Sequence, residues 1–310
     1  MITRVATFAL SDQMIASALR TEATMANLQV QEASGLQSQF LAGYGADAER
    51  VVNLQVSVTR AQSYIDAATL ADSKAQVMFT ALGGTGSGIS DIISRLRTAL
   101  SAATTGSSTA MASLISSAQQ MLPEMQSLLN TQYNGEYVFG GARTTTPPVD
   151  LSTFATGAGS LTAADTSYYQ GDSEIASVQV AADQTVAYGI TADNPAFEQV
   201  MRVLKFVANS SSLSSADITN ALNLASSALD DVATVQAKLS NADAQIVSAK
   251  SLQTDYQGFA QTLGSDLSGV DVGALTAQLA TRNSPRPSPP TPRSKVWSVP
   301  SAISTTRSSN

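Results

Sequence analysis

The chain has 310 residues, a formal net charge of −7 and only 13% charged residues, with neither cysteine nor histidine. These absences exclude disulfides, thiolate nucleophiles, imidazole bases and the commonest zinc ligands, which argues against an enzyme. The acidic balance argues against nucleic acid as a partner. No apolar run reaches the ~18 residues of a membrane span, and the apolar start is too short for a signal peptide. We therefore expect neither membrane insertion nor the general secretory route.

The first predicted element is a helix over residues 8–33, which ends near Ser34 and Gly35. Apolar side chains recur there every three or four residues, a spacing typical of one helix face. We assign residues 1–44 to an N-terminal helical arm, the inner assembly region. The seam of this arm is predicted to consist of Met14, Ala18, Met25 and Leu28.

A long helix is predicted to begin near Asp47, where a carboxylate suits the positive end of the helix dipole. Its alternating spacing of three and four indicates a heptad seam that includes Val51, Leu54, Val58 and Ile65, with one polar interruption at Asp72. The glycine-rich run 83–88 is either a weakened stretch of this helix or a break after which the helix resumes in phase. A phosphate-binding loop is the alternative, but no buried strand precedes the run and no Lys-Ser/Thr pair follows it.

A second break at residues 104–109 predicts a returning antiparallel helix with a kink at Pro123. Residues 45–136 then form the N-terminal half of a helical bundle. The middle, residues 137–193, is predicted to be a β-rich outer insert, because two alternating runs around 175–180 and 185–190 flank a turn at 181–184.

Four acids in this middle segment could supply paired carboxylates for acid–base chemistry. They are Asp165, Asp172, Glu174 and Asp183. No feature of the sequence fixes their separation, and Asp is common in turns, so we favour turn residues.

Helix returns at Pro195, and a last arm begins at Ser215. Residues 194–265 are assigned to the C-terminal half of the bundle, and residues 266–281 to a truncated C-terminal arm. The predicted seam here consists of Leu239, Ile246, Tyr256, Phe259 and Leu263. We place Asp230, Asp231 and Asp243 on solvated helix faces away from that seam.

The elements together predict a mainly α fold. Its N- and C-terminal arms would form a long antiparallel, coiled-coil-like bundle around a small β-rich insert. No catalytic residue, cofactor or metal site is predicted. The sequence indicates a structural protein that works by packing helices.

The order of these parts resembles the flagellin superfamily, and within it the hook-associated protein 3 (hook–filament junction) family. The resemblance covers residues 1–280 and rests on the run NTQYNGEYVFGG at 130–141, followed by YYQGD. The family's motif, where the helical domain passes into the outer β domain, is matched by Asn134, Gly135, Tyr137, Phe139 and Gly140.

The resemblance implies a structural subunit of the bacterial flagellum that joins hook to filament by helical-arm packing. Such a subunit would be extracellular, exported by the flagellar type III apparatus without a cleaved signal peptide. Its implied partners are copies of itself, a neighbouring hook-associated protein, flagellin and a flagellar export chaperone. Filament flagellin itself is the near alternative. A secreted effector or adhesin with activity in the central insert is the remote one.

The end of the chain departs from the family, whose members finish with an apolar amphipathic helix. Residues 282–310 are instead rich in Pro, Ser and Arg without helical spacing, and no acid follows Asp271. We interpret this segment as a disordered tail, produced by a reading-frame change or by a divergent end. If the protein carries this tail, we expect impaired assembly or chaperone binding.

Overall fold

The structure, a computed structural model, describes residues 2–83, 86–154 and 160–283. It divides into two compact units: unit 1 is Met1–Gly45 with Ser268–Asn310, and unit 2 is Ala46–Leu267. The predicted fold class is confirmed, because α-helices dominate the described residues and the strands form two small antiparallel sheets.

Unit 1 contains helices α1 (Ile2–Ser34) and α7 (Val272–Asn283). The predicted end of the first helix is confirmed: Gly35 has φ 68°, a left-handed conformation that suits glycine after a helix. Backbone pairing between Leu36 and Gly269 joins the two parts of this unit. Because α7 runs to Asn283, it includes the first two residues of the predicted tail. The rest of that tail, residues 284–310, lies outside the described residues.

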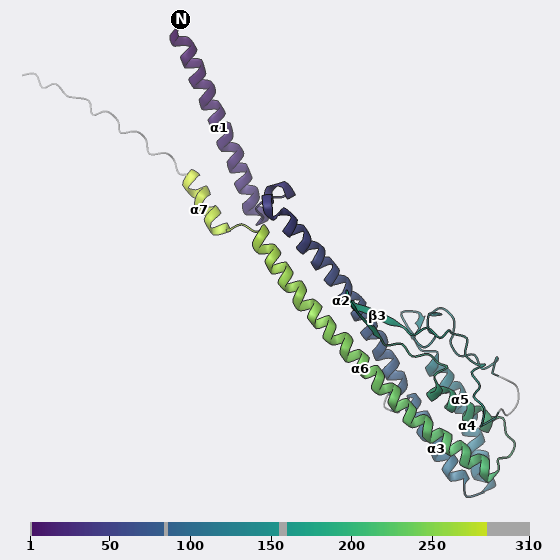
Figure 1. Cartoon of the computed structure of the whole chain (residues 1–310). Helices are drawn as coiled ribbons and strands as arrows, with labels where there is room; N and C mark the ends of the chain where they lie inside the picture. The colour runs from purple at the N-terminus through teal and green to yellow at the C-terminus, as the bar shows by residue number, and fades with distance from the viewer. Residues whose placement is uncertain (1, 84–85, 155–159, 284–310) are drawn as a thin grey trace, which may run out of the picture. The chain divides into compact units, whose positions relative to one another are not determined.

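Two long helices dominate unit 2. They are α2 (Ala48–Gly83), entered through the short helix η1 (Leu41–Asp47), and α6 (Ser215–Ser268). Side-chain hydrogen bonds join Gln257 to Gln62 and Lys250 to Asp72, so residue numbers fall on one helix as they rise on the other. The helices are therefore antiparallel, and they lie side by side in Figure 1. The buried face of α2 is rich in alanine, which lets the helices pack closely.

Helix α3 (Ile89–Ala103) begins after the glycine-rich run, so the long helix breaks and resumes. The Asp91 carboxylate accepts a hydrogen bond from the Gly88 N–H at 3.1 Å and caps the new helix. The returning helix α4 (Ser108–Leu129) continues through Pro123. An exposed ion pair between Arg95 and Glu124 links α3 to α4.

The two sheets lie between α4 and α5 along the chain. Strands β1 (Gln132–Tyr133) and β2 (Glu136–Tyr137) form a tight hairpin after α4. The predicted second hairpin is confirmed with shorter strands, β3 (Ser177–Ala181) and β4 (Gln184–Ala187). Strand β3 packs on α2.

Helix α5 (Pro195–Ala208) begins at the predicted proline, which follows the cap residue Asn194. The hydrophobic core of unit 2 lies where α3, α4, α5 and the adjoining parts of α2 and α6 meet. Figure 1 shows α4 and α5 gathered at this end of the long helix pair. The middle segment is thus anchored at one end of the bundle.

Candidate functional site

The predicted family motif lies where α4 passes into the middle segment. Asn134 and Gly135 have φ values of 52° and 82° and make the turn between β1 and β2, a conformation typical of Asn-Gly hairpins. Phe139 is fully buried and packs edge-on against Phe197 of α5, with ring centroids 6.0 Å apart. The backbone of Phe139 also accepts a hydrogen bond from the Ala192 N–H at 2.9 Å. The motif thus joins α4, the middle segment and α5.

The other two motif residues contact the loop that follows. The Tyr137 N–H donates to the Thr144 carbonyl at 2.8 Å. The backbone of Gly140 lies close to that of Arg143. A Cβ atom added to residue 140 would lie only 2.7 Å from the carbonyl oxygen of Arg143. This close approach explains glycine at position 140 through local packing.

Asn130, at the end of α4, holds the loop by pairing with one backbone unit. Its amide nitrogen donates to the Val149 carbonyl and its amide oxygen accepts from the Val149 N–H, both at 2.9 Å. Val149 itself is fully buried. Asn130 was not among the predicted site residues, although an Asn directly after the end of a helix is a common capping residue.

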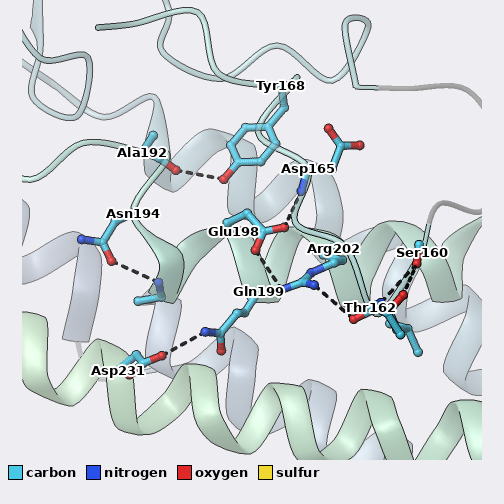
Figure 2. A network of polar contacts seen from close by, with 12 residues as sticks. Ser160, Thr162, Asp165, Tyr168, Ala192, Asn194, Glu198, Gln199, Arg202 and Asp231 are labelled. Carbon is cyan, nitrogen blue, oxygen red and sulfur yellow. Dashed lines mark hydrogen bonds and ion pairs between the residues drawn. The ribbon is translucent and has the colours of Figure 1, made fainter. Parts of the chain in front are cut away.

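A buried ion pair on α5 binds the segment around residues 160–169 and holds it against this helix (Figure 2). Arg202 and Glu198 lie 3.0 Å apart, with side-chain exposures of 11% and 4%. Each also binds backbone of that segment: Glu198 accepts from the Asp165 N–H at 2.8 Å, and Arg202 donates to the Leu161 carbonyl at 3.1 Å. A buried ion pair needs such additional hydrogen bonds to offset its desolvation.

A second buried cation, Lys205, lies one turn further along α5. Its ammonium is 3.8 Å from the centroid of the Phe154 ring, a cation–π contact. Burial lowers the pKa of Lys205, and the nearby Asp165 carboxylate opposes that shift. Phe154 also packs edge-on against Tyr168, whose hydroxyl donates to the Ala192 carbonyl at 3.0 Å. These contacts stabilise the middle segment on α5.

Three of the four acids of the middle segment act in turns, as we favoured, whereas Glu174 contributes only its backbone N–H to the turn at Asp172. Asp165 accepts from the Ser167 N–H at 3.0 Å, and Asp172 accepts from the N–H groups of Ala142 and Glu174 at 2.9 and 3.0 Å. Asp183 lies in the turn between β3 and β4. Within the described residues, no three acidic side chains come close enough together to hold a metal ion.

The placement of Asp243 on a solvated helix face is wrong. Asp243 is half-buried beside Asp72 of α2, and its Oδ1 atom is buried without a hydrogen-bond partner in the described part of the chain. Asp243 lies one helical turn after Leu239 and one turn before Ile246, which are both buried, so it borders the face that packs on α2. Asp230 is exposed as expected, whereas Asp231 accepts a hydrogen bond from Gln199 at 3.0 Å.

The predicted seam of unit 1 is largely uncovered. Met14 and Ala18 are exposed, whereas Met25 and Leu28 are half-buried. Three further apolar side chains on α1, outside the predicted seam, are also more than half exposed. The resulting α1 patch consists of Leu10, Met14, Ile15 and Leu19.

The predicted seam of unit 2 divides into covered and uncovered parts. Leu239 and Ile246 are buried at 2% and 0% exposure. Intermediate burial is found for Val51, Leu54, Val58, Ile65 and Leu263. Helix α6 also carries an α6 patch of Leu252, Tyr256 and Phe259, which are 65%, 47% and 66% exposed. Residues 239–263 of α6 therefore supply both bundle contacts and an apolar surface that stays exposed in the described part of the chain.

Solved structures with a similar fold are known, although no family model and no curated protein matches the chain. A protein from Vibrio parahaemolyticus, assigned as a flagellar hook-associated protein, superimposes with TM-score 0.58. The match covers 72% of this chain and 97% of that one, at 15% sequence identity. This chain has the fold of a flagellar hook-associated protein.

Bacillus cereus FlgL also matches, at 12% identity over 82% of this chain and 99% of that one, but its TM-score of 0.35 is too low to support the comparison. None of the described helices is long and apolar enough to span a membrane.

Proposed function

We propose that this protein is a structural subunit of the bacterial flagellum that joins hook to filament by packing its helical arms against neighbouring subunits. The observation that carries the proposal is the hook-associated fold combined with uncovered apolar patches on α1 and α6. Contiguous exposed apolar surface on a protein marks an interaction site.

The energetics favour assembly through these patches. Burying a large aliphatic or aromatic side chain contributes about 1.5–3 kcal/mol. Four such side chains make up the α1 patch and three the α6 patch. Covering both patches with neighbouring subunits therefore lowers the free energy without any catalytic chemistry, and packing against a neighbour stabilises a long helix such as α1.

The same patches support the proposed partners. Copies of this chain, a neighbouring hook-associated protein and flagellin would bury them in the assembled flagellum. An export chaperone would cover them before assembly, since exposed apolar stripes are prone to bind indiscriminately. The proposed location is outside the cell, after export by the flagellar apparatus without cleavage of a signal peptide.

Deleting the gene in the source bacterium tests this proposal. Loss of a junction subunit leaves hooks without filaments, while flagellin is still exported and accumulates in the medium. Loss of filament flagellin, the near alternative, removes both the filament and that secreted protein. Normal filaments on the deletion strain would contradict the proposal.

A further inference from the structure

Two carboxyl groups meet across the long helix pair of unit 2. Asp72 of α2 forms an ion pair with Lys250 of α6, with Oδ2 and Nζ 3.1 Å apart, and its Oδ1 accepts from Gln76 at 2.7 Å. The side chains of Asp72 and Lys250 are only 13% and 29% exposed. Asp243 of α6 lines a groove together with Gln76, the residue that donates to Asp72, so its carboxyl group lies beside that of Asp72. Three ionisable groups thus share one partly buried site.

One oxygen of this cluster has no donor. Oδ1 of Asp243 is buried, and no hydrogen-bond donor reaches it among the described residues. Two ionised carboxylates can only accept, so neither can satisfy the other. An unpaired buried polar atom is costly, and a proton held between the two acids would supply the missing donor.

The charges around the site agree with a bound proton. Asp72 from α2 and Lys250 from α6 are the charged groups that act on Asp243, so two acids face one cation. Burial and the neighbouring Asp72 raise the pKa of Asp243, and Lys250 opposes the shift. Gln76, Thr80 and Ser240 also line the groove beside Asp243, and they add no charge.

We propose that Asp72 and Asp243 share one proton and form a pH-sensitive clasp between α2 and α6. With the proton bound, the acids hydrogen-bond across the helix pair and Lys250 neutralises the remaining charge. When the proton leaves, two carboxylates repel each other and the pairing of α2 with α6 loosens. A groove of about 530 Å³, lined in part by Asp243, gives solvent access to the site.

The sign of the pH dependence follows from this arrangement. A group whose pKa is raised on folding contributes stability that is fully present below its unfolded pKa. That stability is lost as the pH rises through the folded pKa. The clasp therefore holds unit 2 more tightly in mildly acidic solution than at neutral pH.

Thermal unfolding of the full chain, followed by circular dichroism from about pH 4 to about pH 8, tests the clasp. Asp243→Asn supplies a permanent N–H donor to Asp72 and removes the titration. Its Tm should exceed that of the unchanged protein by about 2–4 °C near neutral pH, and the difference should shrink toward pH 4. Asp72→Asn, on α2, should raise the Tm near neutral pH in the same way. This second variant tests the proposal even where Asp243→Asn does not fold.

Two further variants complete the test. Lys250→Met should steepen the loss of Tm with rising pH, because it leaves two acids without their cation. Asp230→Asn is the matched control, since Asp230 is an exposed acid on the same helix, and its difference should not vary with pH. A pH-independent effect of Asp243→Asn, or a lower Tm for both Asn variants near neutral pH, would overturn the proposal.

Discussion

Phe139 packs edge-on against Phe197, with ring centroids 6.0 Å apart and an interplanar angle of 81°. Both rings are fully buried, although Phe139 follows the β1–β2 hairpin and Phe197 lies on α5. Their contact joins the start and the end of the middle segment to the same core.

We expect Phe139→Ala to destabilise unit 2 by about 3–5 kcal/mol, the usual cost of truncating a buried aromatic side chain. The free energy of unfolding from urea denaturation, followed by circular dichroism, checks this. Ile175→Ala is the matched control, because Ile175 lies in the same segment and is 47% exposed. Equal losses for the two variants would show that Phe139 is not a core residue.

The Glu198–Arg202 ion pair should be strongly coupled. Removing one partner leaves the other charged and buried, so Arg202→Met should cost about 3–5 kcal/mol. The double variant with Glu198→Leu should recover part of that loss. A double-mutant cycle measured by urea denaturation gives the coupling energy directly.

The exposed pair Arg95–Glu124 provides the comparison, since its side chains are 52% and 40% exposed. Its coupling should not exceed about 1 kcal/mol, as is usual for surface pairs. A coupling energy for Glu198–Arg202 as small as that of the surface pair would show that the buried ion pair does not stabilise the segment packed on α5.

Two glycine substitutions should have opposite effects. Gly135 has φ 82°, so Gly135→Ala should destabilise unit 2 by about 1–2 kcal/mol. Gly258 lies within α6, and an added Cβ atom would meet no other atom within 4 Å. Gly258→Ala should therefore stabilise unit 2 by about 0.5–1 kcal/mol. Changes of the same sign in Tm would show that the backbone conformation at one position is misassigned.

Asp172 should make the middle segment sensitive to acid. Hydrogen bonds from the backbone N–H groups of Ala142 and Glu174 hold the pKa of Asp172 below its usual value of 3.8. Its contribution to stability is therefore present above pH 3.8 and is lost as the pH falls through the lower folded pKa. Asp172→Asn should flatten the acid side of the Tm profile. A profile that keeps its slope below pH 4 would argue against this role.

Much of the helical framework could be predicted because heptad spacing and Pro195 are local signals. The β3–β4 hairpin was likewise visible in alternating side chains. Buried charges could not be predicted, since Glu198 and Arg202 differ from surface residues only through segments folded over α5. The error at Asp243 has the same origin, because its neighbour Asp72 lies on another helix, far away in the sequence.

The central claim is that the α1 patch assembles the protein into the flagellum. Electron microscopy of flagella tests it in a strain whose own gene is replaced by Leu10→Ser, Met14→Ser and Leu19→Ser combined. Ile175→Ser serves as the control, because it changes an exposed apolar residue outside the arms. We predict that the triple variant is exported but that its cells carry hooks without filaments. Cells with the control variant should carry normal filaments. Normal filaments on the hooks of the triple variant would contradict the account.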